Sequence, residues 1–296
     1  MFTRIDHVMI CVPDLKRAIE QYRNMGFNMH EGGVHPGKGT HNAIAFPQDD
    51  YIELLAIRDM AEHQATAGEP GNSHAGLAQY IAAGGGLRYI ILQSNDLAAD
   101  VAGMRARGID VSDALDRGRR TPAGQDLRWK AAVLGPQNPL PIFFIQHLTP
   151  VEERRKQVPG GTSQPNAVFT IERAYVISRD AKADAALYAK VLGIPQPPMQ
   201  RGMVIMSDMA VFQLGPTGLG IAQPYAPGPG AEALERRGPG PFQILFRTKS
   251  MGAAARWMQE HGMPPLQRGV RNTGEQAMLV PPDLAGGVYI GFVGPE

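Results

Sequence analysis

The chain has 296 residues, of which 43% are hydrophobic, so it is long enough to bury the cores of two ordinary domains. Its 29 basic and 28 acidic residues give a net charge of +1, which removes the positive field that nucleic-acid binding depends on. The single cysteine, Cys11, excludes an internal disulfide, and no apolar run is long enough to span a bilayer. We therefore expect a cytoplasmic protein that binds neither nucleic acid nor membrane.

Four segments of the chain open in the same way. In chain order they are IDHVMICVPDLKRAIEQYRNMGF, LRYIILQSNDLAADVAGMRARGI, IERAYVISRDAKADAALYAKVLGI and FQILFRTKSMGAAARWMQEHGM. Each starts with a short apolar strand, reaches a residue that favours a helix N-cap, and continues as an amphipathic stretch that ends at Gly. The capping residues are predicted at Asp14, Asp96, Asp180 and Ser250. The pattern thus predicts a strand followed by a helix, four times.

Short apolar runs separated by Gly or Pro follow each predicted helix and indicate further strands, such as THNAIAF and YIELLAI in the first copy. The order βαβββ therefore occurs four times, which predicts an α+β protein. The charged, then Pro/Gly/Ser-rich segment TPVEERRKQVPGGTSQPN separates the second copy from the third. We predict an N-terminal domain over 1–148, a linker over 149–167 and a C-terminal domain over 168–296, with two modules in each domain.

The repeats, together with the motifs DHVMICVPDL, HPGKGTHN, YIELLAI and RRTPAGQDLRW, resemble the vicinal oxygen chelate superfamily, and within it the glyoxalase-like branch. This resemblance implies two eight-stranded open barrels, shaped like cups, whose concave faces hold a divalent metal or an organic ligand. Known members include metal-dependent lyases and isomerases, ring-cleaving dioxygenases and drug-binding proteins. The fold by itself therefore does not fix the function.

The first and last strands of the first module carry two candidate metal ligands. Val8, Ile10 and Val12 form the apolar row expected against the helix, which turns His7 towards the cup because strand side chains alternate between faces. The same alternation turns Glu53 of YIELLAI towards the cup. The resemblance places metal ligands at these two positions, and Glu53 is also the candidate catalytic residue. The alternative is a structural His–Glu pair without a metal.

The strand THNAIAF carries a candidate third ligand, His41. If Ile44 and Phe46 face the helix, His41 points into the cup, where it would complete the site for a divalent ion (Zn, Fe, Mn or Ni) or contact the substrate. His35 and His41 also flank a Gly-rich loop, so exposed turn residues are the alternative interpretation.

The second module offers residues suited to substrate binding. Tyr89 stands at the position equivalent to His7, where ring-cleaving iron dioxygenases need a second histidine. Arg120 and Trp129 of RGRRTPAGQDLRWK lie where a loop turns into an inward strand. Arginine suits an anion and tryptophan suits an aromatic ring, so the candidate substrate-binding residues are His41, Tyr89, Arg120 and Trp129. A solvated charge run with a tryptophan in the core is the alternative.

The equivalent positions in the third and fourth modules hold Arg173 and Gln243, so we expect the active cup in the first domain. The function that these features favour is a divalent-metal-dependent lyase or isomerase acting on a small carbonyl or hydroxylated aromatic or anionic compound. A non-catalytic small-molecule-binding or resistance protein and an extradiol-type ring-cleaving dioxygenase are the alternatives. The protein could also form a homodimer, which the sequence neither predicts nor excludes.

Overall fold

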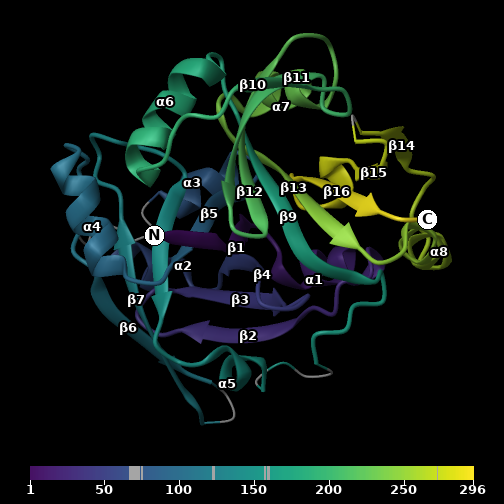
Figure 1. Ribbon diagram of the computed structural model, residues 1–296. Coiled ribbons are helices and arrows are strands. Elements are labelled where there is room, and N and C mark those ends of the chain that lie inside the picture. The colour runs from purple at the N-terminus through teal and green to yellow at the C-terminus, as the bar shows by residue number, and fades with distance from the viewer. Residues whose placement is uncertain (67–73, 75, 122–123, 157, 159–160, 272) are drawn as a thin grey trace.

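The computed structural model describes the chain apart from residues 67–73, 75, 122–123, 157, 159–160 and 272. The predicted α+β architecture is confirmed: the described residues form 16 strands, arranged in two eight-stranded sheets, and 8 α-helices. Each sheet curls into an open half-barrel, and the helices pack on the sheets (Figure 1).

The first sheet has the strand order β2-β3-β4-β1-β5-β8-β7-β6. Its central strand β1 runs parallel to β4 and antiparallel to β5, so it joins two βαβββ modules. The strands are β1 (Phe2–Cys11), β2 (His30–His35), β3 (Thr40–Ala45), β4 (Tyr51–Ile57), β5 (Gly86–Ser94), β6 (Leu115–Arg120), β7 (Asp126–Val133) and β8 (Ile142–His147).

The second sheet repeats this topology in the order β10-β11-β12-β9-β13-β16-β15-β14. Its strands are β9 (Val168–Ile177), β10 (Met199–Gly202), β11 (Ser207–Leu214), β12 (Thr217–Pro224), β13 (Gly240–Thr248), β14 (Gln267–Val270), β15 (Gln276–Val280) and β16 (Tyr289–Gly294). The division into domains at 148 and 168 stays a prediction.

The helices are α1 (Leu15–Asn24), α2 (Met60–Thr66), α3 (Leu77–Ala82), α4 (Leu97–Ala106), α5 (Val151–Arg155), α6 (Ala181–Leu192), α7 (Pro229–Arg237) and α8 (Met251–Glu260), with a 3-10 turn at Pro282–Leu284. All four predicted N-caps are confirmed. The side chains of Asp14, Asp96, Asp180 and Ser250 each accept a hydrogen bond of 2.9–3.1 Å from the backbone N–H three residues on. These caps satisfy amide groups that the first turn of a helix leaves without partners.

The two sheets share one hydrophobic core, to which helices α1, α4, α6 and α8 all contribute. Phe27 of the first half packs its ring 4.9 Å from Phe246 and 6.0 Å from Phe292 of the second half. The hydroxyl of Tyr22 donates to the carbonyl of Ala285 across the same boundary. The cups therefore lie on the sheet faces that point away from this core. No helix among the described residues combines the length and the apolar character needed to cross a membrane.

Replacing Phe27 by Ala tests the shared core. The side chain is 1% exposed and contacts both halves, so its truncation leaves a cavity between them. We expect the free energy of unfolding to fall by about 3–5 kcal/mol while unfolding stays a single transition, measured by urea denaturation. Val34→Ala, at a residue that is 49% exposed, is the control and should change stability by less than about 0.5 kcal/mol. Two separate transitions in the wild type would contradict the shared core.

Candidate active site

A buried carboxylate, Asp6, joins the two modules of the first sheet. The register of β1 against β5 shifts between Ile5 and His7, so Asp6 sits in a β-bulge and turns to the same face as His7. Its side chain is fully buried and accepts hydrogen bonds from His7 Nδ1 at 2.7 Å and from His147 Nε2 at 2.8 Å. Asp6 thereby connects β1 with the last residue of β8.

The two histidines keep Asp6 ionised. Burial by itself would raise the pKa of Asp6, but the charge of His147 and the hydrogen bonds from His147 and His7 outweigh it and hold the pKa well below its usual value. A carboxylate can only accept hydrogen bonds, so the proton of the neutral His7 ring lies on Nδ1. The Nε2 atom of His7 is left to face the cup.

Glu53 of β4 lies opposite His7. Its Oε2 is 3.7 Å from His7 Nε2, while its Oε1 accepts a hydrogen bond of 2.7 Å from the side-chain amide of Asn42 on β3. A separation of 3.7 Å is too long for a hydrogen bond. His7 and Glu53 are thus each fixed from behind, and the two facing atoms are not bonded to each other. Both residues are nearly buried, with exposed fractions of 4% and 8%.

Aromatic rings enclose this pair. The ring of Tyr51 stacks on His7 with the ring centroids 4.2 Å apart, and Phe143 meets His7 edge-on at 6.3 Å. Tyr89 in turn packs edge-on against Phe143 at 5.6 Å. Trp129 of β7 is in register with His147 and packs with the apolar residues of the same cup. The pair thus lies in surroundings of low polarity, where electrostatic interactions are stronger than in water.

Two further histidines lie near Glu53. Burial lowers the pKa of His74 to about 4 and also lowers the pKa of His35, against the attraction of the Glu53 carboxylate, which raises both. Both imidazoles are therefore neutral near pH 7. The hydroxyl of Thr40 bridges the two rings: it lies 3.4 Å from His74 Nδ1 and 2.9 Å from His35 Nδ1. They add hydrogen-bonding groups to the site without adding charge.

The predicted orientation of the β3 side chains is wrong by one residue. Ile44 is paired with Glu53 and lies on the cup face, whereas Ala43 and Ala45 join the core beneath the helices. His41 shares the face of Ala43, so the structure does not bring it to His7 and Glu53. Asn42, its neighbour, occupies the place expected for the third ligand.

The prediction that Arg120 of β6 binds substrate in the cup is also corrected by the strand register. The side chain of Arg120 is 73% exposed and lies 3.6 Å from the carboxylate of Asp126, on the face opposite to Trp129. The alternation along β6 instead places Arg117 and Arg119 on the face of Trp129, as the pairing of Arg117 with Trp129 shows. Trp129 and Tyr89 do lie on the cup face.

Sequence reasoning missed four residues of the site: Asp6, Asn42, His74 and His147. Gln146 and His147 point to opposite faces of β8. Gln146 turns to the helix side and accepts a hydrogen bond from the backbone N–H of Leu97, while His147 reaches Asp6. The IDHV motif carried a signal for Asp6, since an acidic residue inside an apolar strand needs a partner. No signal in the sequence identified His74.

Two side chains of the site have the chemistry of divalent-metal ligands. His7 Nε2 and Glu53 Oε2 fit two ligands of one ion, and Asp6 stands behind His7 as a carboxylate commonly does behind a metal-binding histidine. Among the described residues, however, no three His, Cys, Asp or Glu side chains are grouped as a metal site requires. The described residues thus do not fit a three-ligand centre, and the metal stays a prediction.

Comparison with known proteins places the chain among glyoxalase-like proteins. A family model described as a glyoxalase-like domain matches residues 5–192. A hypothetical protein from Staphylococcus aureus has a similar structure, with a TM-score of 0.70 and 16% identity over 98% of this chain and 99% of that one. A mutant 4-hydroxymandelate synthase from Streptomyces coelicolor has a TM-score of 0.63 and 14% identity, over 99% and 92%.

A xylose isomerase-like TIM barrel/4-hydroxyphenylpyruvate dioxygenase fusion protein also matches, with a TM-score of 0.61 and 11% identity. The match covers 99% of this chain and 49% of the fusion protein, so the chain spans about half of that length. At these identities the three structures establish the fold. A search of curated protein sequences finds no match.

Replacing Asp6 by Asn tests the central carboxylate. The change leaves the donors of His7 and His147 with a weaker, neutral partner, so we expect stability at pH 7 to fall by about 3–5 kcal/mol in urea denaturation. Because the folded-state pKa of Asp6 is depressed, its stabilisation is present above the unfolded-state value of about 3.9 and is lost as the pH falls below it.

The difference between wild type and Asp6→Asn should therefore shrink below about pH 4. Asp113→Asn is the matched control, because that side chain is 73% exposed in a surface ion pair with Arg105 and should contribute less than about 1 kcal/mol. A difference that does not change with pH would show that the charge of Asp6 is not what stabilises the fold.

Proposed function

Because the chain belongs to the glyoxalase-like domain family, we propose that it is an enzyme of the lyase or isomerase type that moves a proton on a small carbonyl compound. The observation that carries the proposal is the open pair of His7 Nε2 and Glu53 Oε2. The back of each residue is hydrogen-bonded at 2.7 Å, by Asp6 and by Asn42, yet the facing atoms are 3.7 Å apart. A purely structural pair would close this distance to a hydrogen bond.

The surroundings of the pair favour a small substrate. His7 and Glu53 are nearly buried, and the apolar rings of Tyr51 and Phe143 lie against His7. Apolar and aromatic walls around a few fixed polar groups are typical of small-molecule sites. A compound with a carbonyl or hydroxyl group next to a carbon-bound hydrogen supplies both the oxygen and the proton that such a pair can handle.

The chemistry assigned to the pair is general acid–base catalysis. Glu53 Oε2 receives the proton from the carbon next to the carbonyl group, while the imidazolium form of His7 donates its Nε2–H to the carbonyl oxygen and gives that proton to it as the enol forms. Asp6 holds the His7 ring and keeps Nδ1 protonated, and Asn42 orients Glu53. Return of the proton to a neighbouring carbon completes an isomerisation, whereas loss of a neighbouring leaving group completes a lyase reaction.

A divalent ion held by the same pair is the second candidate, and the carboxylate of Asp6 behind His7 favours it. In that case the purified wild-type protein carries stoichiometric Zn, Fe, Mn or Ni, and His7→Ala and Glu53→Gln both lose it. An extradiol-type dioxygenase has less support, because Tyr89 stands at the position of the second histidine and His147 is bonded to Asp6.

The acid–base function is tested by deuterium exchange. The wild type, incubated in D₂O with a panel of small 2-oxo acids and hydroxyketones that includes pyruvate and hydroxyacetone, should catalyse deuterium incorporation next to the carbonyl group, followed by proton NMR. Because each variant removes one proton-transferring group, His7→Ala and Glu53→Gln should lower the rate by roughly 10²–10⁴-fold. Glu31→Gln, at an exposed carboxylate of β2, is the matched control and should not change it.

Exchange that persists in EDTA supports the acid–base assignment, whereas exchange that EDTA abolishes and a divalent ion restores supports the metal. If no compound exchanges faster with the wild type than with the two variants, the proposed reaction is wrong, and a non-catalytic binding protein becomes the better account.

A further inference from the structure

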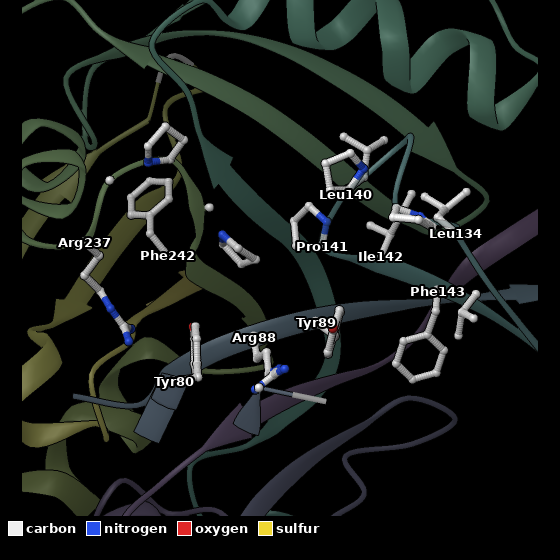
Figure 2. Close-up of a pocket in the computed structure, with 18 of the residues that line it drawn as sticks. Tyr80, Arg88, Tyr89, Leu134, Leu140, Pro141, Ile142, Phe143, Arg237 and Phe242 are labelled. Carbon is white, nitrogen blue, oxygen red and sulfur yellow. The ribbon is translucent and has the colours of Figure 1, made fainter. Parts of the chain in front are cut away.

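A cavity lies where the two sheets meet, at the edge of the first cup, and the cup residues Tyr89 and Phe143 are among its lining residues. It has a volume of about 1130 Å³ and is lined by the ends of β5 and β8 from the first sheet and by α7 and β13 from the second. Figure 2 shows Tyr80, Arg88, Tyr89, Arg237 and Phe242 around it. Its size reaches that of pockets for drug-sized ligands. Neither His7 nor Glu53 is among its lining residues.

Two β-bulges at equivalent places of the two sheets supply residues to this cavity. The register of β5 against β1 shifts between Met9 and Ile10, which leaves Arg88 as the extra residue. The register of β13 against β9 shifts between Pro241 and Gln243, which leaves Phe242 as the extra residue. Bulges redirect side chains and are common beside functional sites. Here the repeated bulge directs a cation and an aromatic ring into one cavity.

Aromatic rings hold two guanidinium groups at one end of the cavity. Arg88 lies over the rings of Tyr80 and Tyr89, at 5.1 Å and 5.3 Å from their centroids, and Arg237 lies over Tyr80 at 5.1 Å. The Tyr80 hydroxyl donates to the carbonyl of Leu87, which fixes its ring. Stacking occupies the faces of a guanidinium group and directs its N–H edge elsewhere.

The guanidinium group of Arg237 lines the cavity and hydrogen-bonds to a neutral backbone carbonyl group. Its Nη1 donates to the carbonyl of Gly287 at 3.4 Å, and the neighbouring Arg236 donates to the same oxygen. A Cβ atom at Gly86 would stand 2.0 Å from Arg237 Nη1, so the glycine makes the close approach of this arginine possible. A carbonyl oxygen does not neutralise the positive charge, so this end of the cavity favours an anion.

The opposite end of the cavity is lined mainly by apolar side chains. Leu134, Leu140 and Ile142 lie away from Arg237 in Figure 2. Asp110 is the one carboxylate among the described lining residues. It stands beside Gly135, at the same end of the cavity as Leu134. Positive charge and apolar surface are thus separated along the cavity. A ligand that matches both ends has an anionic group and an apolar body.

We propose that this inter-sheet cavity is a binding site for an aromatic carboxylate, with Arg88 and Arg237 binding the carboxylate group while Phe242 and Tyr89 contact the ring. The planar fork of a guanidinium group matches the two oxygens of a carboxylate, and aromatic side chains stack on an aromatic ring. The site is separate from the His7–Glu53 pair and does not depend on the function proposed for that pair.

The test uses two probes of the same shape, 2-naphthoate and its neutral counterpart 2-naphthamide, with binding measured by isothermal titration calorimetry. The wild type should bind naphthoate more tightly than naphthamide. Arg88→Gln and Arg237→Gln should each weaken naphthoate binding by roughly ten- to a hundredfold, because a hydrogen bond to a charged group is lost, and should leave naphthamide binding nearly unchanged.

Arg201→Gln is the matched control, because Arg201 also stacks on a tyrosine, Tyr225 at 4.2 Å, but pairs with Asp208 on β11 outside the cavity. It should not change the binding of either probe. His7→Ala should also leave naphthoate binding unchanged. Loss of binding in His7→Ala, or equal losses of both probes in the two cavity variants, would overturn the assignment.

A measurement on the wild type keeps the test decisive if a variant does not fold. The preference for naphthoate over naphthamide should be clear at low ionic strength and should weaken in about 1 M salt, because salt screens the attraction between the arginines and the carboxylate. Equal affinities for the two probes at low salt would overturn the proposal.

Discussion

The first cup depends on the buried carboxylate of Asp6. A charge without water is very unfavourable in a protein interior, and Asp6 is fully buried, so the chain must bring hydrogen-bond donors to it. It does so from two strands, with His7 beside it on β1 and His147 at the end of β8. Because β8 belongs to the second module, this interaction connects both halves of the first sheet. The same requirement sets the orientation of the His7 ring that faces Glu53.

The second sheet repeats the bulge but changes its chemistry. Glu172 is the extra residue of β9 at the place equivalent to Asp6, and Arg173 follows it where His7 would stand. Glu172 forms ion pairs with Arg247 and Arg271. Arginine keeps its proton at every physiological pH, so this arrangement holds the sheet together but cannot exchange protons as an imidazole does. The apolar cluster around Tyr175 and Leu245 packs on the same side of the second sheet.

Much of the fold could be predicted because local signals and global fold agree. The four capping residues predicted from spacing, from Asp14 to Ser250, all cap helices. The alternation along β1 and β4 correctly predicted that His7 and Glu53 lie on one face of the sheet. A residue that caps a helix acts within one turn of chain, and such signals survive in any tertiary context.

The errors arose where packing partners come from distant parts of the chain. Ile44 and Phe46 were expected beneath the helix because they are large and apolar, but Val158 from beyond β8 covers them on the cup side. Small Ala43 and Ala45 face the helices instead. When both faces of a strand are buried, alternation no longer tells which face is the cup.

The most direct test of this account is the protonation of the His7 ring, measured by ¹⁵N NMR of the imidazole nitrogens with His7 assigned from a His7→Gln spectrum. We predict that the neutral ring carries its proton on Nδ1, because this atom donates to Asp6, and that Nε2, the atom that faces Glu53, carries none. A neutral ring with its proton on Nε2 would contradict the account, because His7 would then offer a donor to Glu53 and Asp6 would not orient it.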